Sequence, residues 1–577
     1  MTLHPLDWGV ILAYLGFALS VGFWVRERAE GGKESYFLAG RSLPWWWAGT
    51  SIAATTFAAD TPLAVTGIVA DRGLSGNWLW LSMMAVHAAV VVYFAEKWRR
   101  SEMLTDAELV SIRYTGRSAE YLRVFRAVLF AVVYNAIILG WVLRAMGKII
   151  DPVFRWDVWF PTVTGHLDRL WPGGTTLGAA SEVLTIILLV GIVTLYSSLG
   201  GIRGVVFTDL IQFALAMVGS IWLAIAAWEA VGGRAELASS LTNLYGDHQY
   251  TDLFPSFTRG WAAALRLGAF TFGAYLVVQS FGTIPSDGGG YLMQRLASCR
   301  THRDARKAAG LFTGLHYLVR VWPWFIVAVA ALVLIPIGQE QTALGGAGAP
   351  VAGDREMAYP VLLFELLPVG VVGILVASLL AAFMSTVDTH FNWGASYIVN
   401  DLYLRVKPDA TSNQQIKVAR TCVVLFAIAS ILVALQIDTI EQAWKWVAFI
   451  GASLGVPTAA RWLWWRVNAI SELTAGGVGL GTALLVTLGT SWLYEFQLVV
   501  TAAASVGGML IGIMFGTPTR EEQLQSFRDH VQPSGAWPGT NTKQAFRQFG
   551  GIVLRVAGLV ITIILVLLGG TWLLFHP

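Results

Sequence analysis

The amino-acid sequence predicts an all-α protein that crosses a membrane many times. Of its 577 residues, 55% are hydrophobic and only 13% are charged, whereas a soluble protein has roughly 25% charged residues. Apolar stretches of about 18 residues or more recur to the end of the chain, each long enough to cross a ~30 Å hydrocarbon core as a helix. This composition argues against a soluble enzyme, and a net charge of only +3 argues against a nucleic-acid partner.

Fourteen stretches of the sequence have the length and composition of transmembrane helices. The first follows no basic segment and precedes two arginines, so we expect a retained helix rather than a cleaved signal peptide. The predicted spans lie near residues 6–25, 44–70, 76–97, 122–147, 178–200, 204–230, 258–284, 310–338, 368–400, 418–436, 440–465, 471–494, 497–516 and 550–574.

Lysine and arginine residues predict the orientation of these spans. With the N-terminus outside, the segments that face the inside contain 28 of the 39 basic residues, as the positive-inside rule requires. We therefore expect a multi-pass protein of the plasma membrane, which in a bacterium is the inner membrane. The longest polar stretch, residues 517–549, is too short for a soluble domain of about 50 residues, so the function must lie within the helical bundle.

The second span contains a cluster of polar residues. Asp60 and Pro62 follow the adjacent threonines Thr55 and Thr56 in an otherwise apolar stretch. Because Pro62 cannot donate a hydrogen bond to the preceding turn, the helix either breaks and leaves free carbonyl groups in the membrane, or only kinks while the threonines bond to their own helix. The local sequence favours neither alternative.

Four small or hydroxyl-bearing residues share one face of the ninth span. Ala382, Ser385, Thr386 and Thr389 follow helical spacing. Such a face suits close packing against another helix, or a cradle of neutral oxygen atoms for Na⁺. Asp388 lies beside it and must be paired, protonated or bound to a metal ion.

Another carboxylate lies near the inner end of the sixth span. Gly200 and Gly201 predict a tight turn, and Asp209 follows about two helical turns into the next span. This carboxylate either binds a cation, or forms a salt bridge or a contact with the helix N-terminus near the lipid headgroups. Both alternatives stay open.

Four motifs are spread over nearly the whole chain. They are Tyr36-Phe37-Leu38-Ala39-Gly40-Arg41 with Trp45 to Trp47, Leu199-Gly200-Gly201 with Thr208-Asp209 and Gln212, Gln294-Arg295, and Ala381 to Thr389 with Asp401-Leu402-Tyr403. Each motif alone is weakly specific. In this order and with fourteen spans, the chain resembles the sodium/solute symporter family, which includes the sodium–glucose and sodium–proline cotransporters.

The resemblance implies a fold and a function. Family members have the LeuT-like fold, in which two five-helix repeats of inverted topology surround a site near the membrane midplane. The repeats would be residues 44–230 and 258–466, after an N-terminal helix and inner loop (1–43) and before three accessory helices (467–577). The implied function is Na⁺-coupled import of a small organic solute (a sugar, an amino acid or a carboxylate) by alternating access, so the chain would be a transporter and not an enzyme.

The resemblance also implies sodium sites at motif positions. For the first site these are Ala53 and Thr56, through their backbone, with Ala382, Ser385 and Thr386. For a second site, which some members have nearer the cytoplasm, these are Asp209, Ser385, Asp388 and Thr389.

Solute contacts do not follow from the resemblance, because the family's polar pair before Gln294 is replaced here by a stretch that begins at Pro285 and contains three glycines. The candidates are therefore polar residues within the spans. They are Thr55, Asp60, Gln279 and His316. His316 has Arg320 one helical turn later, and the two residues either face the solute or form a buried pair that neighbouring helices satisfy.

Three other functions are alternatives. A proton-coupled carrier would use Asp209 or Asp388 as the titrating group. A membrane enzyme would need a catalytic constellation, and the nine histidines include no metal-binding pair such as H-E-x-x-H. A sensor would need an output module, for which residues 517–549 are too few. The expected partners are Na⁺, the solute and the lipid bilayer, and assembly into a homo-oligomer stays open.

Overall fold

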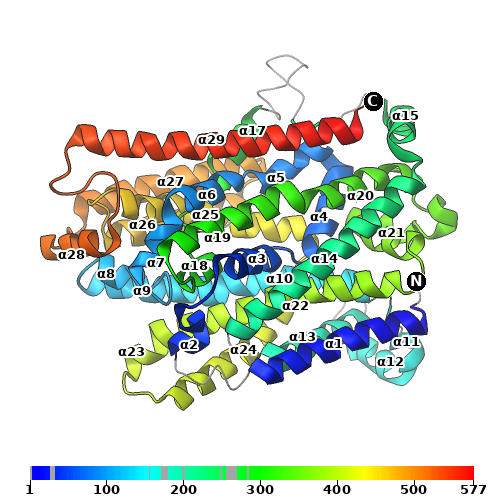
Figure 1. The fold of residues 1–577 in the computed structure, drawn as a ribbon, viewed down its shortest axis with the longest axis horizontal. Coiled ribbons are helices and arrows are strands. Elements are labelled where there is room, and N and C mark those ends of the chain that lie inside the picture. Colours follow the sequence, from blue (N-terminus) through cyan, green and yellow to red (C-terminus); the bar gives the residue numbers. More distant parts are fainter. Residues whose placement is uncertain are drawn as a thin grey trace.

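The computed structural model describes residues 3–25, 33–151, 153–154, 156–170, 180–197, 202–246, 250–254, 269–281 and 285–576. Within them, every regular element is helical apart from two isolated β-bridges. Most long helices run side by side along one axis of the molecule (Figure 1). Eight of the described helices are long and apolar enough to cross a membrane, or ten if each of two bent helix pairs counts as one span. The prediction of an all-helical protein with many apolar spans is thus confirmed.

The helices follow the predicted spans closely. In the first half they are α1 (Pro5–Val25), α2 (Lys33–Leu38), α3 (Trp45–Thr55), α4 (Asp60–Arg72), α5 (Trp78–Leu81), α6 (Met84–Ala89), α7 (Ala95–Ser101), α8 (Leu109–Arg113), α9 (Arg117–Val128), α10 (Asn135–Ile150), α11 (Trp156–Trp159), α12 (Pro161–Leu170), α13 (Ala180–Ser197), α14 (Ile202–Ala230) and α15 (Gly233–Tyr245). In the second half they are α17 (Ala269–Val277), α18 (Tyr291–Ala297), α19 (His302–Gly314), α20 (Val321–Leu334), α21 (Ala358–Leu366), α22 (Val371–Tyr397), α23 (Leu404–Val406), α24 (Ser412–Ala434), α25 (Ile440–Leu463), α26 (Ala469–Gly489), α27 (Tyr494–Phe515), α28 (Glu521–Val531) and α29 (Thr542–Phe575). Of the predicted span 258–284, only residues 269–281 lie within the described part.

The second predicted span is a broken helix. α3 ends at Thr55, α4 begins at Asp60, and the two axes differ by 52°. Pro62 lies in the first turn of α4, where its missing N–H would have no helical partner in any case. The structure therefore has the interruption rather than the simple kink. The carbonyl oxygens of Ala53 and Thr55, at the end of α3, accept hydrogen bonds from side chains.

The helices α22 and α29 show how burial is divided between the core and the lipid. In the most apolar segment of each, 89% of the residues are buried for α22 but only 11% for α29. α22 packs among α1, α3, α10, α14 and α24, whereas α29 lies along one edge of the bundle (Figure 1). Exposed side chains on α29, such as Leu554 and Leu565, are apolar, as a lipid-facing surface requires.

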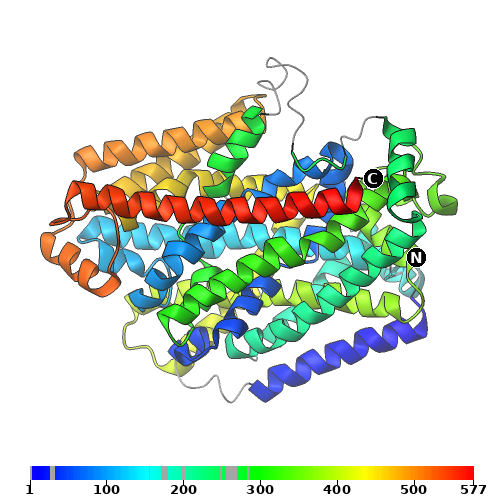
Figure 2. The same ribbon diagram turned by 45° about the horizontal axis from the view of Figure 1, so that its top comes forward.

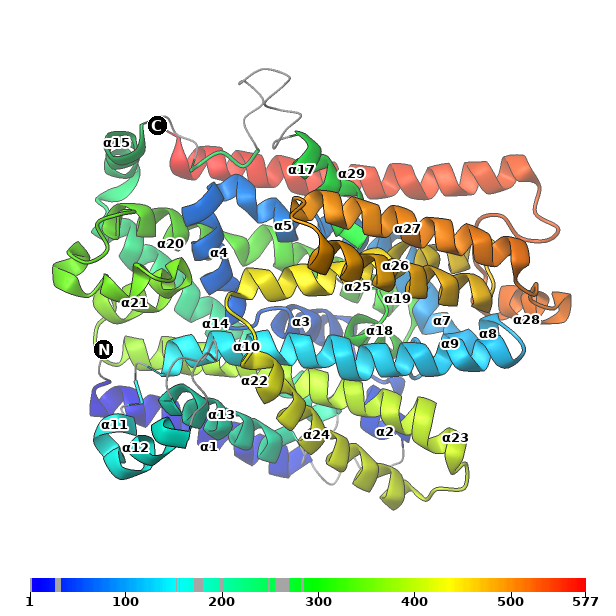
Figure 3. The same cartoon turned by 180° about the vertical axis from the view of Figure 1, so that it is seen from behind.

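The two termini lie at the same end of the molecule (Figures 1 and 3). α1 packs along α22 and lies at the opposite edge of the bundle from α27 (Figure 2). α26 and α27 pack against each other and against α25. Residues 517–549, which we expected to be a loop, contain the helix α28, which packs on α7 and α8, and the start of α29.

Candidate functional site

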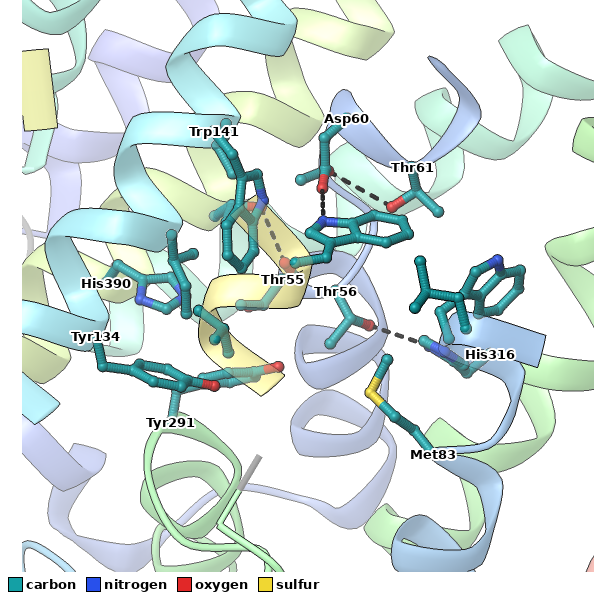
Figure 4. A pocket seen from close by; sticks show the side chains of 18 of the residues that line it. Thr55, Thr56, Asp60, Thr61, Met83, Tyr134, Trp141, Tyr291, His316 and His390 are labelled. Carbon is teal, nitrogen blue, oxygen red and sulfur yellow. Dashed lines mark hydrogen bonds between the residues drawn. The ribbon is translucent and has the colours of Figure 1, made fainter. Parts of the chain in front are cut away.

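A cavity of about 130 Å³ lies beside the break between α3 and α4. Its walls come from both halves of that broken helix and from α5, α10, α22 and α25, which are far apart in the sequence. One water molecule needs roughly 10–15 Å³ of such space, so the cavity can hold on the order of ten waters or a solute with about as many non-hydrogen atoms. Figure 4 shows side chains from these elements around one shared space.

All four residues predicted to contact a solute line this cavity. They are Thr55, Asp60, Gln279 and His316. Asp60 is the first residue of α4, and its carboxylate accepts hydrogen bonds from the Trp444 indole (3.3 Å) and the Thr61 hydroxyl (3.5 Å). Both donors are neutral, and no basic side chain in the described part of the chain forms an ion pair with Asp60.

Gln279 and His316 are only partly engaged by the protein. The side-chain oxygen of Gln279 accepts a hydrogen bond from the Tyr494 hydroxyl (2.7 Å). The amide nitrogen of Gln279 is buried and has no hydrogen-bond partner among the described residues. His316 contacts the Thr56 hydroxyl through Nδ1 (3.4 Å; Figure 4). The cavity therefore offers a solute at least one unused amide donor.

Arg320 joins the cavity to the end of α3. Its guanidinium donates hydrogen bonds to the Ala53 carbonyl oxygen (2.9 Å) and the Thr56 hydroxyl (3.0 Å), and it also contacts the His316 ring. The side chain is buried and lies over the Trp324 ring, 5.3 Å from its centre. His316 and Arg320 thus form a buried contact and also line the cavity, so both alternatives drawn from the sequence hold in part.

The residues predicted for the first sodium site lie where α3 meets α22. The Thr386 hydroxyl donates hydrogen bonds to the carbonyl oxygens of Thr55 (2.9 Å) and Ala382 (3.1 Å). A hydroxyl of α22 is therefore within hydrogen-bond distance of the last carbonyl groups of α3. The hydroxyl of Ser385, the next residue back on α22, donates instead to Asp209 (2.6 Å). The structure brings the two elements together, while several of the predicted oxygen atoms have protein partners.

The residues predicted for the second sodium site surround a buried arginine. The Asp209 carboxylate accepts hydrogen bonds from two serine hydroxyls, at 2.5 Å and 2.6 Å. Arg295 donates to the Thr389 hydroxyl (2.6 Å) and interacts electrostatically with both Asp209 and Asp388. Sequence analysis identified Arg295 only as part of a motif. In the structure it supplies the positive charge of this cluster.

The donor atoms at these two places suit Na⁺. Carbonyl and hydroxyl oxygens are hard, uncharged ligands, and the carboxylates near α22 add negative charge. In the part of the chain that the structure describes, no three His, Cys, Asp or Glu side chains gather as a transition-metal centre would need. The chemistry of the donor set therefore fits a hard alkali cation.

Several residues of the cavity wall were missed by sequence analysis. The aromatic ones are Trp80, Tyr134, Trp141, Tyr291 and Trp444. Aromatic side chains in apolar spans are ordinary packing residues, so nothing in the sequence distinguishes these five from the rest. His390 did carry a signal, because an ionisable residue within a span is expensive. It lies directly after Thr389, and its Nδ1 is 2.7 Å from the side-chain oxygen of Asn135.

In a comparison with known proteins, the chain is similar to several sodium-coupled transporters. The sodium/glucose cotransporter of Vibrio parahaemolyticus is 25% identical over 458 residues, which are 77% of each chain. Sodium/glucose cotransporter 4 of Danio rerio is 25% identical over 503 residues, 83% of this chain and 71% of the relative. The sodium/sialic acid symporter NanT of Aliivibrio fischeri is 24% identical over 535 residues, 90% of this chain and 95% of the relative.

The fold also matches a solved structure. A Na⁺-coupled sialic acid symporter in a substrate-bound, outward-open state superimposes with a TM-score of 0.67 at 19% identity, over 89% of this chain and 98% of the other. This similarity confirms the predicted LeuT-like fold. The model of the family described as "Sodium:solute symporter family" matches residues 36–160 and 175–479, well over half of the chain. The chain therefore belongs to the sodium:solute symporter family.

Proposed function

We propose that this chain is a secondary active transporter that imports a small organic solute together with Na⁺ by alternating access. Na⁺ is the coupling ion of the family to which it belongs. One observation carries the proposal. The four candidate solute residues line a single cavity beside a broken helix, together with Thr56 and Thr386 of the candidate first sodium site. Transporters of this fold class bind their substrates beside such broken helices.

The first Na⁺ would bind between the end of α3 and the middle of α22. The last carbonyl groups of a helix have no helical partners and carry the negative end of its dipole, so they favour a cation. The contact of 2.9 Å between the Thr386 hydroxyl and the Thr55 carbonyl oxygen supports this location, since oxygens of both elements are already adjacent. The proposed ligands are oxygens of Ala53, Thr56, Ala382, Ser385 and Thr386. A second Na⁺ would use Asp209, Asp388 and Thr389.

The solute would occupy the cavity itself, in contact with Thr55, Asp60, Gln279 and His316. The relatives named above are sodium/glucose and sodium/sialic acid transporters, and a solute of about that chemistry has polar groups for these side chains. The aromatic wall would pack against its apolar surface.

The proposed topology has fourteen crossings, with the N-terminus outside. The common position of both termini at one end of the molecule supports it, because an even number of crossings returns the chain to the same side (Figure 1). The proposed repeats are residues 44–230 and 258–466. We expect the protein in the plasma membrane of its cell.

The driving force is large enough for strong accumulation. One Na⁺ that crosses 100 mV gains about 2.3 kcal/mol, and a tenfold Na⁺ gradient adds about 1.4 kcal/mol. The sum of about 3.7 kcal/mol supports roughly 500-fold accumulation of a neutral solute. A second Na⁺ would square that limit.

The decisive experiment combines a binding screen with transport. The purified protein is heated with sugars, amino acids and carboxylates, each in Na⁺ and in K⁺, and a solute that raises the unfolding temperature only in Na⁺ is then tested in proteoliposomes. We expect uptake driven by an inward Na⁺ gradient. Stabilisation that is equal in K⁺ would contradict sodium coupling. Uptake driven in sodium-free, acid-outside vesicles would favour the proton-coupled alternative.

A further inference from the structure

Arg320 is a buried cation without a carboxylate partner. Its side chain is 1% exposed, and a guanidinium stays charged in any protein environment. Its acceptors, the Ala53 carbonyl, the Thr56 hydroxyl and the His316 ring, are all uncharged. Its Nε has no hydrogen-bond partner among the described residues. Arg320 interacts electrostatically with Asp60, which lines the same cavity, but no carboxylate lies at ion-pair distance from it in the described part of the chain. A buried guanidinium without a direct ion pair is costly, so an anion supplied by a ligand would stabilise it.

Other buried arginines of this protein are compensated internally. Arg126 contacts carboxylates at 3.1 Å and 3.2 Å, and Arg461 contacts one at 2.6 Å. The half-buried Arg123 also has a carboxylate at 2.6 Å. Arg113 and Arg295 form no such ion pair in the described part of the chain, but neither of them lines the cavity. Arg320 is therefore set apart by two properties together: it has no carboxylate at ion-pair distance in the described part of the chain, and it lines the cavity proposed for the solute.

The Ala53 carbonyl oxygen is a partner for two cations. It accepts the hydrogen bond from Arg320 at 2.9 Å, and it is a proposed ligand of the first Na⁺. Two cations that share one carbonyl oxygen repel each other strongly in a medium of low dielectric constant. Na⁺ can therefore bind well here only if Arg320 moves away from Ala53 or if an anion lies beside both charges.

We infer that the solute carries a carboxylate that binds Arg320, and that Na⁺ and this carboxylate bind cooperatively because Na⁺ takes over the contact of Arg320 with Ala53. This inference rests on the proposed function and names the substrate class for it. Arg320 is then the residue that determines specificity for an anionic solute. Its planar fork can hold a carboxylate by two parallel hydrogen bonds.

The rest of the cavity restricts the solute further. Asp60 lines the same cavity and forms no ion pair with Arg320, so a second carboxylate near it would be repelled. Figure 4 shows Asp60 and Thr61 on one side of the cavity, and Tyr134 and Tyr291 on another. The side of Asp60 suits hydroxyl or ammonium donors. The solute is therefore a monocarboxylate that also carries such donors, as hydroxy acids, amino acids and sugar acids do.

The first test needs no knowledge of the solute. The midpoint of Na⁺-induced thermal stabilisation is measured for the purified, solute-free protein and for Arg320→Gln. Removal of the competing cation should lower the Na⁺ midpoint about tenfold, within the roughly 5–150-fold range typical of coupled sites. An unchanged or raised midpoint in Arg320→Gln overturns the inference.

Two further variants keep this test decisive. Arg320→Lys retains the charge, so its Na⁺ midpoint should stay within about twofold of that of the unsubstituted protein. If Arg320→Gln does not fold, Arg320→Lys is used instead, because a lysine should bind a carboxylate more weakly than an arginine does. Arg303→Gln removes an exposed arginine at the start of α19 and should leave the Na⁺ midpoint unchanged. A shift of similar size in Arg303→Gln would show a general charge effect and would also overturn the inference.

The second test uses matched pairs of probes in saturating Na⁺. The pairs are glucuronate and glucose, lactate and propane-1,2-diol, and alanine and alaninamide. We expect thermal stabilisation by a carboxylate but not by the partner that lacks the carboxylate, and at least tenfold weaker binding of that carboxylate by Arg320→Lys. Stabilisation only by a probe that lacks the carboxylate overturns the inference and leaves the proposed function intact. If no probe binds, the Na⁺ midpoint of Arg320→Gln decides. Absence of any Na⁺ effect on the unsubstituted protein would instead contradict the proposed function itself.

Discussion

Two groups of buried charged side chains in this bundle differ in whether they form ion pairs with each other. The first group, which we call the inner ion cluster, consists of Asp106, Arg126, Asp287, Arg461 and Glu472. Each of its arginines has a carboxylate within 3.2 Å. At the cavity, the hydrogen bonds of Arg320 and Asp60 to described residues go to uncharged partners. Charges that the protein balances internally hold one arrangement of helices, whereas unbalanced charges around a cavity are available to ligands.

The inner ion cluster also connects parts of the chain that are far apart. Glu472 on α26 lies 3.2 Å from Arg126 on α9 and 3.8 Å from Arg461 on α25. The Trp98 indole of α7 donates to the Asp287 carbonyl oxygen at 2.6 Å, just before α18. Movement of the two proposed repeats apart at this end would break the contact between Trp98 and Asp287, so this contact stabilises the conformation in which this end is closed.

The largest expected effect comes from one substitution made at two arginines. Arg461→Gln leaves the Asp287 carboxylate buried without its cation and should lower the free energy of unfolding by about 3–5 kcal/mol. Arg320→Gln leaves no carboxylate without an ion-pair partner but removes the hydrogen bonds to Ala53 and Thr56, so it should lower the same free energy by only about 1–2 kcal/mol. Both values are measured by denaturant unfolding in detergent micelles.

A surface pair provides the control for this comparison. Glu96 pairs with Arg306, whose side chain is 55% exposed, and Glu96→Gln should cost about 0–1 kcal/mol. Equal destabilisation by Arg461→Gln and Arg320→Gln would show that the two groups of charges do not differ as the geometry suggests.

Much of the fold was predictable from the sequence because lipid imposes a simple rule. Backbone polar groups must be satisfied within each span, so long apolar stretches have to be helices. At Pro62, the local residues could not decide between a broken helix and a simple kink. The break in the second span is stabilised by bonds from Arg320 and Thr386 to the carbonyl groups of Ala53 and Thr55, and these donors lie more than 260 residues away along the chain.

The candidate site was predictable in part for the same reason. Asp60, Gln279 and His316 were found because polar groups in apolar spans are conspicuous. The role of Arg295 beside Asp209 was missed, because the partner of a buried charge depends on how the helices pack. The aromatic wall gave no signal, since Trp141 and Trp444 differ from packing residues only in the space they face.

The next largest effect is that of the membrane potential on solute accumulation, which should be about 50-fold. An anionic monocarboxylate, such as a hydroxy acid or a sugar acid, that enters with one Na⁺ carries no net charge across the membrane, whereas its entry with two Na⁺ carries one positive charge. If Asp209 helps to bind a second ion, a potential of −100 mV inside should raise accumulation by roughly 50-fold, equivalent to about 2.3 kcal/mol. Asp209→Asn should remove this dependence on voltage. The check is the ratio of ²²Na⁺ to labelled solute taken up, which should fall from two to one, and a ratio that stays at two would exclude Asp209.

A smaller effect is expected at the hydroxyl face of α22. Ser385→Ala removes an oxygen proposed for the first Na⁺ and the hydrogen bond to Asp209 (2.6 Å). The loss of one such contact is worth about 1–1.5 kcal/mol, so the Na⁺ concentration for half-maximal stabilisation should rise about tenfold. Ser396→Ala is the matched control, since that buried hydroxyl bonds only to a carbonyl of its own helix (2.6 Å). Similar Na⁺ midpoints for the two variants would count against the site.

The smallest effect is expected at the indole that holds Asp60. The hydrogen bond from Trp444 on α25 to the Asp60 carboxylate is 3.3 Å long. Trp444→Phe keeps the aromatic wall but removes this donor, and a long hydrogen bond contributes less than about 1 kcal/mol, so solute affinity should fall only about threefold to fivefold. Trp156→Phe removes an indole donor of the same kind, 2.8 Å from Thr185 and remote from the cavity, and should leave affinity unchanged. A loss above about 50-fold in Trp444→Phe, measured by calorimetry with the solute from the binding screen, would mean that the Trp444 indole is essential to binding, which contradicts the inference that Asp60 is a weakly held acceptor.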